Sequence, residues 1–221
     1  MTRTAPRTLV FDCDGVVLAS NAIKTEAFRR VAGARYGEAA AQALVEHHVR
    51  NGGVSRFEKF RYLVEDIVGA APDPAECESL CTAYGEEVFA RLLECEVAPG
   101  LEPLRASTPD ARWMIVSGGA QHELREVFRR RGLDTLFDAG IFGSPDSKDA
   151  ILAREIATGN LRKPAAFFGD SAYDHRAATA VGLDFVFVSD WSELPDWAGY
   201  CARHGLPHRP TLADAVRFTI P

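Results

Sequence analysis

The stretch Thr8-Leu9-Val10-Phe11-Asp12-Cys13-Asp14-Gly15 decides how this 221-residue chain is organised. A short apolar run ends abruptly in two carboxylates one residue apart, followed by a glycine. An apolar run of this length near the start of a chain is typical of a buried central strand in a parallel sheet. In open α/β sheets, ligands bind outside the carboxyl ends of the strands. Asp12 and Asp14 therefore lie where a binding site is expected.

The spacing of these two carboxylates limits what they can bind. Strand alternation places Asp12 and Asp14 on one side of the strand and Cys13 on the other. Because neighbouring carboxylates repel, each resists ionisation beside the other, and the pair favours a bound cation or a shared proton. Gly15 allows a sharp turn and the close approach of a ligand to the backbone. Taken alone, the same residues also fit a polar turn, since Asp and Gly are common turn formers.

Composition restricts the class of protein. A length of 221 residues with 47% hydrophobic residues allows one large domain, or a domain with an insert, and an ample core. The formal net charge is −6 and the basic residues are dispersed, which argues against nucleic acid as a main partner. With no signal peptide and no apolar stretch of membrane-spanning length, we expect no membrane partner and a cytoplasmic location. The five cysteines form no Cys-x-x-Cys pair and are expected to be free thiols in a reducing compartment.

A long helical segment follows the first strand. The pattern is helical from Ser20 to about Gly69, and residues 80–92 repeat apolar side chains every four positions. About eighty residues of helix between two strands is far too much for one βαβ crossover. We therefore expect an inserted helical domain over residues 17–97, in a core made of residues 1–16 and 98–221.

From residue 98 onward the pattern alternates between strands and helices. The strands expected after the first cover residues 112–116, 139–142, 165–168 and 184–188, and the helices cover 120–131, 148–158, 172–180 and 212–218. This alternation indicates a doubly wound parallel sheet. The predicted fold class is α/β, with a doubly wound parallel sheet and an inserted all-helical cap domain.

Three further polar segments follow the predicted strands. Ser117-Gly118-Gly119 offers a hydroxyl and two amides at a helix start, where anions bind. Lys148 lies in the first turn of a helix and opposes its dipole, so we expect an anionic group to face it. A second acidic cluster, with Asp170 and Asp174, follows the strand at 165–168. Each segment alone also fits a helix cap or a solvated side chain.

Taken together, these polar segments share one edge of the predicted sheet. If each were only a helix cap or a solvated side chain, there would be no reason for all of them to lie at the same edge. Acidic groups from two strands suit Mg²⁺, which binds few carboxylates and keeps water and phosphate ligands. A hydroxyl, glycine amides and a Lys suit a phosphoryl group. We therefore predict a Mg²⁺-dependent phosphoryl-transfer site.

The order of these motifs resembles the haloacid dehalogenase superfamily. The motifs that carry the resemblance are Phe11-Asp12-x-Asp14-Gly15, Ser117-Gly118, Lys148 and Gly169-Asp170-x-x-x-Asp174. They span the whole core, and the helical insert after the first motif is similar to the C1-type cap of this superfamily. The resemblance implies a Rossmann-like core and places the chain in the phosphatase and β-phosphoglucomutase-like branch.

The resemblance also implies a role for each matching residue. Asp12 would be the nucleophile and form an aspartyl-phosphate, and Asp14 would act as general acid and then as general base. Ser117 and the Gly118 amide would hold phosphoryl oxygens, and Lys148 would neutralise the charge that develops on them.

The implied metal site uses residues from both acidic segments. Asp12, the backbone carbonyl of Asp14, and Asp170 would bind Mg²⁺, with Asp174 as a further ligand or as a partner that supports the ligands. The dehalogenases of the superfamily lack an Asp at the position of Asp14 and need no metal. Hydrolysis of a phosphomonoester through an aspartyl-phosphate is therefore expected here, and dehalogenation is not.

In this family the cap recognises the leaving group, so the irregular loop at residues 51–56 is a candidate substrate contact. Arg56 is predicted to bind an anionic or hydroxylated substrate, although an exposed Arg beside a capping turn explains it equally well. Lys24 and His175 are further candidates. Residues 21–28 together with 51–59 resemble a subgroup associated with bacterial sugar and polysaccharide biosynthesis. This implies a small phosphorylated sugar, polyol or related metabolite as the substrate.

Several alternatives stay open at this point. A phosphomutase of the β-phosphoglucomutase type has the same motifs, but its cap usually places a His just after the first strand, where this chain has Ala19-Ser20-Asn21-Ala22. A phospho-acceptor of the receiver type would lack the helical insert, and a catalytically silent member would lack a motif residue. The apolar face at residues 80–92 is expected to be core of the cap rather than an oligomer interface.

Overall fold

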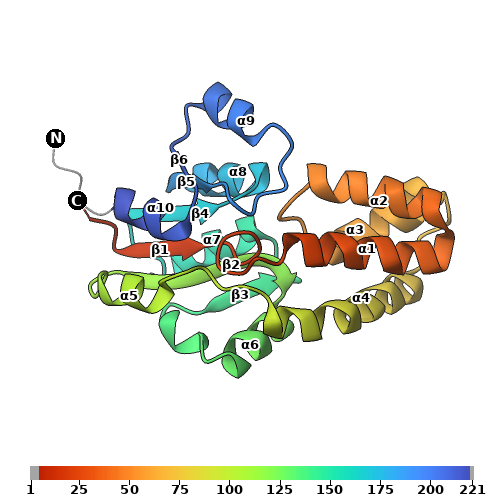
Figure 1. Cartoon of the computed structure of the whole chain (residues 1–221), viewed down its shortest axis with the longest axis horizontal. Coiled ribbons are helices and arrows are strands. Elements are labelled where there is room, and N and C mark those ends of the chain that lie inside the picture. Colours follow the sequence, from red (N-terminus) through yellow and green to blue (C-terminus); the bar gives the residue numbers. More distant parts are fainter. Residues whose placement is uncertain (1–4, 220–221) are drawn as a thin grey trace.

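A six-stranded parallel sheet forms the centre of the computed structural model, which describes residues 5–219 (Figure 1). The strands are β1 (Thr8–Phe11), β2 (Arg112–Ala120), β3 (Ile141–Ser144), β4 (Ala165–Gly169), β5 (Asp184–Val188) and β6 (His208–Arg209). Their order is β3-β2-β1-β4-β5-β6, and every neighbouring pair is parallel. The chain thus moves outward from β1 to β3 and then returns to the other side of β1. The predicted doubly wound α/β fold is confirmed, with its switch point between β1 and β4.

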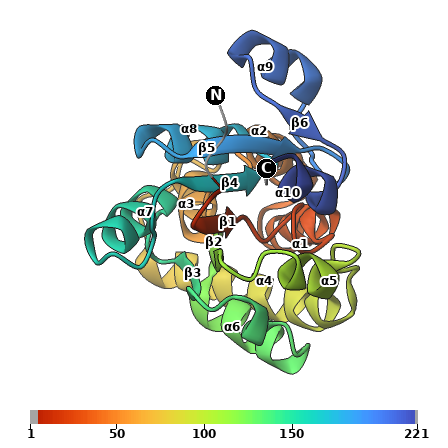
Figure 2. The ribbon, with the colours of Figure 1, turned by 90° about the vertical axis from the view of Figure 1, so that its left-hand side faces the viewer.

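Helices cover both faces of the sheet (Figure 2). The helices from residue 101 onward are α5 (Leu101–Ala106), α6 (Gln121–Arg130), a 3₁₀ turn (Asp134–Leu136), α7 (Lys148–Ala157), α8 (Ala172–Ala180), α9 (Trp197–His204) and α10 (Leu212–Thr219). Helices α7 and α8 lie on one face, and α5, α6 and α10 lie on the other. Strand alternation explains how β1 is buried on both sides: Leu9 and Phe11 pack with α6 and α10, whereas Val10 packs with α7 and α8.

The first four of the helices between β1 and β2 gather at the carboxyl end of the sheet (Figure 1). They are α1 (Asn21–Tyr36), α2 (Glu38–Arg50), α3 (Arg56–Tyr62), which continues as a π-helical turn (Leu63–Ile67), and α4 (Pro74–Glu94). The inserted all-helical segment predicted from the sequence is therefore present, and we call these helices the cap. The division into domains at residues 17 and 97 stays a prediction.

The two chain connections between the core and the cap run side by side. Leu18 forms an antiparallel bridge with Val97. The Ala98 amide donates to the Val17 carbonyl, and the Ala19 amide donates to the Glu96 carbonyl, both at 2.9 Å. The cap is thus tied to the core by a pair of adjacent, hydrogen-bonded connections at the end of β1.

Local sequence signals account for the cap helices. Ser55 caps α3 by accepting a hydrogen bond from the Glu58 amide, and Asp73 caps α4, which begins with Pro74. The apolar face of α4 at residues 80–92 is buried, as predicted, and packs inside the cap. Among residues 5–219, no helix combines the length and the apolar content needed to cross a bilayer.

The predictions for the second half were wrong at some element ends. Strand β2 continues to Ala120 because it pairs there with Ser144 of β3, so Ser117-Gly118-Gly119 lies in a strand and not at a helix start. Strand β3 begins at Ile141, two residues later than expected. Helices α5 and α9 and the two-residue strand β6 were not predicted, because such short elements show too few turns or alternations to give a pattern.

The fold predicts different costs for two glycine substitutions. Gly15 and Gly100 have almost the same positive φ, +74° and +73°. A Cβ at Gly15 would overlap the side chains of Asp170 and Asn21, whereas a Cβ at Gly100 has no neighbour within 4 Å. We expect Gly100→Ala to cost about 1 kcal/mol and to lower Tm by roughly 2–4 °C. Gly15→Ala should lower Tm by clearly more in thermal unfolding, and equal shifts would contradict this account.

Candidate active site

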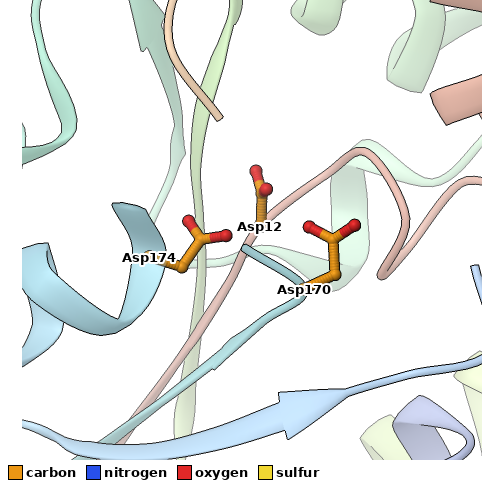
Figure 3. A group of neighbouring side chains, drawn as sticks. All are labelled: Asp12, Asp170 and Asp174. Atoms are coloured by element: carbon orange, nitrogen blue, oxygen red, sulfur yellow. The ribbon is translucent and has the colours of Figure 1, made fainter. Parts of the chain in front are cut away.

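Three buried carboxylates meet at the carboxyl ends of β1 and β4 (Figure 3). Asp12 follows β1, Asp170 follows β4, and Asp174 lies in the first turn of α8. Figure 3 shows Asp12 between the other two, and one oxygen of each lies within 4.8 Å of the others. The group occupies the switch point of the sheet, where α/β folds bind their ligands.

Burial of these acids makes their ionisation costly. Burial, followed by the charge of Asp174, raises the pKa of Asp12 to about 7. Burial and the charge of Asp12 raise the pKa of Asp170 well above its ordinary value. A divalent cation among the three carboxylates would remove this cost, and carboxylate oxygens are the ligands that Mg²⁺ prefers. The donor set therefore fits a magnesium ion.

Lys148 at the start of α7 is enclosed by two of these acids. Its Nζ lies 2.9 Å from Asp12 Oδ1 and 2.5 Å from Asp174 Oδ1, and its side chain is fully buried. Burial acts against the ammonium charge, but Asp12 and Asp174 outweigh it and raise the pKa of Lys148. The anionic group expected opposite Lys148 thus consists of these two carboxylates.

Asp174 is held by hydrogen bonds on both of its oxygens. Its Oδ2 accepts from the Ser171 hydroxyl at 2.6 Å and from the Ser171 amide at 3.2 Å, while Oδ1 faces Lys148. The Ser171 hydroxyl in turn accepts from the Asp174 amide, which completes a capping box at the start of α8. Of the two roles expected for Asp174, this geometry favours support of Lys148 over a direct metal bond.

The side chain of Asp14 has different partners from Asp12. Its Oδ1 accepts from the Ser20 hydroxyl and its Oδ2 faces Lys24 Nζ, each at 2.5 Å. Burial raises the pKa of Asp14, but the charge and hydrogen bond of Lys24 and the hydrogen bond of Ser20 lower it below its ordinary value. Asp14 is therefore ionised in this arrangement, and its carboxylate lies outside the group of three acids. Its role as a metal ligand through the backbone carbonyl stays a prediction.

Ser117 and Gly118 lie at the end of β2, beside the cap loop. Ser117 is buried, and its hydroxyl accepts from the Gly119 amide at 3.0 Å. Gly118 faces the backbone carbonyl of Gly53, and a Cβ at Gly118 would overlap that oxygen. Glycine is thus required here for the cap loop to approach the sheet end.

A cavity of about 60 Å³ lies between the sheet end and the cap. The core contributes Asp12, Asp170 and Gly118 to its lining. The cap contributes several basic groups, of which Lys24, Lys59 and His48 come from three different helices. The cavity therefore has an acidic floor and a basic roof, and it is small enough to favour a compact ligand.

Comparison with known proteins decides the family. A family model described as haloacid dehalogenase-like hydrolase matches residues 6–182. This chain belongs to the haloacid dehalogenase-like hydrolases. No curated protein sequence matches it.

Solved structures show the same fold at low sequence identity. A predicted phosphatase from Clostridium acetobutylicum has a TM-score of 0.73 and 15% identity, covering 97% of this chain and 98% of that one. A protein assigned as a β-phosphoglucomutase from Bacteroides vulgatus has a TM-score of 0.73 and 16% identity, covering 97% and 90%. A protein assigned as a phosphoglycolate phosphatase from Lactobacillus plantarum has a TM-score of 0.71 and 20% identity, covering 97% and 99%.

Arg56 in this haloacid dehalogenase-like hydrolase is buried, in contrast to an exposed Arg beside a capping turn. Its two terminal nitrogens donate to the Glu123 carboxylate of α6 at 3.1 and 2.6 Å. Its guanidinium carbon also lies 4.5 Å from the ring centroid of Tyr84. Arg56 lines the cavity, but its charge is balanced by Glu123, so the pair joins the cap to the core. A direct contact with substrate stays a prediction.

His175 lies on α8 and contacts α9 and β5 rather than the cavity. Its Nδ1 lies 2.8 Å from the Tyr200 hydroxyl, and its ring packs against Phe185 and His204. The residues that line the cavity in the described part of the chain do not include His175. The structure thus places this substrate-binding candidate at a partly exposed contact between α8 and α9, away from the cavity.

Sequence reasoning missed several residues that line or support the cavity. Asn21 donates to Asp170 Oδ2 at 2.7 Å and to the Trp191 carbonyl at 2.8 Å. Lys59 lies three residues after Arg56, so the two side chains share one face of α3. This helical spacing could have identified Lys59 as a second basic residue facing the cavity. Glu123 gives no such signal, because its partner is 67 positions away in the sequence.

The buried Arg56–Glu123 pair predicts a measurable stability difference. We expect Arg56→Met to lower the free energy of unfolding by about 3–5 kcal/mol, because Glu123 is left buried and unpaired. The exposed pair Arg203–Asp196 gives a matched control, and Arg203→Met should cost at most about 1 kcal/mol. Urea unfolding measures both. Similar small costs in the two variants would show that the cap is not held by this pair.

Proposed function

We propose that this hydrolase removes phosphate from small phosphomonoesters, with Asp12 as the nucleophile and Mg²⁺ as the cofactor. The observation that carries the proposal is the position of Asp12. Its carboxylate lies at the floor of the cavity, 2.9 Å from Lys148 and within 4.8 Å of the other two acids. A carboxylate that lies between a buried Lys and acids able to bind a metal ion is suited to attack a phosphoryl group.

In the first step, an oxygen of Asp12 attacks the phosphorus atom of the ester. The new bond joins the Asp12 oxygen to phosphorus, and the bond from phosphorus to the alcohol oxygen breaks. Lys148 and the Gly118 amide stabilise negative charge on the phosphoryl oxygens. Asp14, which is ionised before the ester binds, takes up the proton of the ester monoanion and gives it to the departing alcohol oxygen. The negative charge of the bound ester raises the pKa of Asp14 and so helps it to carry that proton.

In the second step, water attacks phosphorus and the bond to Asp12 breaks. Asp14 takes a proton from the water and passes it to the departing inorganic phosphate, and Asp12 is restored as a carboxylate, so both acids end the cycle ionised. Lys24 supports this step, because its ion pair with Asp14 at 2.5 Å favours the ionised base. General acid and base help of this kind typically contributes about 10²–10⁴-fold in rate.

Asp12 and Asp170 would hold the magnesium ion, together with the backbone carbonyl of Asp14. A bound Mg²⁺ neutralises phosphoryl charge and keeps neighbouring carboxylates ionised. Asp174 holds Lys148 in place instead. Asn21 donates to Asp170 Oδ2, so it helps to orient this ligand.

The proposed substrate is a small phosphorylated sugar, polyol or related metabolite in the cytoplasm. The cavity of about 60 Å³ supports a compact leaving group. The similar solved structures assigned as phosphoglycolate phosphatase and as predicted phosphatase agree with a hydrolytic reaction. The structure assigned as β-phosphoglucomutase keeps phosphoryl transfer between two sugar positions as an alternative. The absence of His from residues 19–22 of this chain favours hydrolysis.

The first test is phosphate release from a panel of sugar, polyol and carboxylic acid phosphates with Mg²⁺. We expect Asp12→Asn to lower kcat by at least about 10³-fold, because the nucleophile is lost. The matched control Asp184→Asn changes an exposed acid on β5 and should keep full activity. Metal-dependent release that survives Asp12→Asn would contradict the proposed mechanism.

Metal removal provides a separate test of the acid cluster. We expect treatment with a chelator to abolish phosphate release and added Mg²⁺ to restore it. Asp170→Asn should weaken Mg²⁺ activation by roughly 10–100-fold or more, because it removes a charged ligand. Full activity in the presence of chelator, with bound metal shown to be removed, would exclude this role for Asp12 and Asp170. Conversion of one sugar phosphate into its isomer without phosphate release would favour the mutase.

A further inference from the structure

Lys59 is a fully buried cation in the roof of the cavity. It lies on α3 of the cap and lines the same cavity as Asp12, with about 2% of its surface exposed. Its Nζ lies 2.7 Å from His48 Nδ1 on α2 and 5.5 Å from the ring centroid of Phe28 on α1. Three cap helices thus fix the ammonium at one place.

The other cations around the cavity each have a carboxylate partner. Lys148 faces Asp12 and Asp174, Lys24 faces Asp14, and Arg56 faces Glu123. Within residues 5–219, Lys59 has no carboxylate within 4.0 Å. A buried charge without a partner is costly, so this position favours an anion supplied from outside the protein.

His48 is a neutral partner for Lys59. Burial, followed by the charge of Lys59, lowers the pKa of His48 well below its ordinary value. Nδ1 of a neutral His accepts the hydrogen bond from the Lys59 ammonium and adds no charge to balance it. Burial, followed by the charge of Lys24, also lowers the pKa of Lys59 to about 7. A bound anion would oppose this shift and hold Lys59 in its charged form.

The remaining acid near this end of the cavity is already engaged. Glu193 lines the cavity, and its Oε2 accepts a hydrogen bond from the Thr25 hydroxyl at 2.6 Å. The charges of Asp14 and Glu193 both act on Lys59 from a distance, but neither acid forms an ion pair with it. The roof of the cavity therefore keeps one cation without an ion-pair partner, opposite the acid floor where the phosphoryl group is proposed to react.

We propose that Lys59 binds a second anionic group of the substrate. This inference rests on the proposed function, because it takes the reacting phosphate to lie at Asp12. The substrates are then phosphomonoesters whose leaving group carries its own carboxylate or second phosphate. Because Asp12 and Lys59 line the same small cavity, we expect the two anionic groups to be separated by a short carbon chain. Neutral polyol phosphates of the same length are the poorer ligands.

The test compares esters that differ in the second group alone. The probes are 2-phosphoglycolate, the bisphosphate of ethylene glycol, and 2-hydroxyethyl phosphate, which has a neutral hydroxyl instead. Binding is measured by titration calorimetry at pH 7 with Mg²⁺ and the full-length Asp12→Asn variant, which holds esters without turnover. We expect at least one acidic ester to bind about tenfold or more tightly than the neutral ester, since a charged hydrogen bond replaces a neutral one. The two acidic probes show whether a carboxylate or a phosphate is preferred.

Substitution of Lys59 then assigns the preference to this side chain. Lys59→Met in the same background keeps an unbranched side chain one atom shorter, removes the charge, and should abolish the discrimination. Lys59→Arg keeps the charge and should retain part of it. Lys163→Met removes an exposed Lys far from the cavity and should change nothing. Circular dichroism and thermal unfolding confirm that each variant folds.

Binding and turnover separate the two proposals. Equal affinity for acidic and neutral esters, including no measurable binding of either, overturns the assignment of Lys59. So does a preference that survives Lys59→Met. Phosphate release by the wild-type enzyme tests the proposed function independently of Lys59. If none of the probes releases phosphate, the proposed phosphatase activity is overturned, and the binding preference is still measured.

Discussion

The structure depends on the balance of charge around Asp12. Three acids are buried together at the switch point of the sheet, and in the described structure Lys148 is the cation that contacts two of them. The surrounding backbone is adapted to this group. Gly15 leaves room for Asp170, and the capping box of α8 fixes Asp174 against Lys148. Such an arrangement is costly without ligands, and phosphoryl and metal ligands would use the charge that it concentrates.

The cap extends the same principle to the other side of the cavity. Its helices place Lys24 against Asp14, which follows β1, and Arg56 against Glu123 of α6. The charges of these two cap cations are therefore balanced by carboxylates of the core. Lys59 alone, among the cavity cations of residues 5–219, faces a neutral His48. Lys24 and Arg56 thus join the cap to the core, whereas Lys59 is placed where a substrate group could bind.

The sequence was sufficient for features that depend on local patterns. The run at residues 8–11 predicted a central strand, and the two acids after it line the cavity at the carboxyl end of the sheet, where a site was expected. The caps at Ser55 and Asp73 predicted where α3 and α4 begin. Contacts between distant segments could not be predicted in this way. Arg56 was interpreted as a substrate contact or an exposed Arg because its partner Glu123 lies 67 positions away, and no pattern in the sequence indicated that three helices enclose Lys59. Such pairings depend on tertiary packing, which periodicity does not contain.

The most direct test of the account is chemical trapping of the phosphorylated residue. The wild-type enzyme is mixed with Mg²⁺ and an ester that it hydrolyses, quenched during turnover and reduced with borohydride, which converts an aspartyl-phosphate into homoserine. Peptide mass spectrometry then locates the modified position. The account predicts modification at Asp12 that requires the ester and is absent when the ester is left out. Modification at another acid, or no modification while phosphate is being released, would contradict the assignment of Asp12 as the nucleophile.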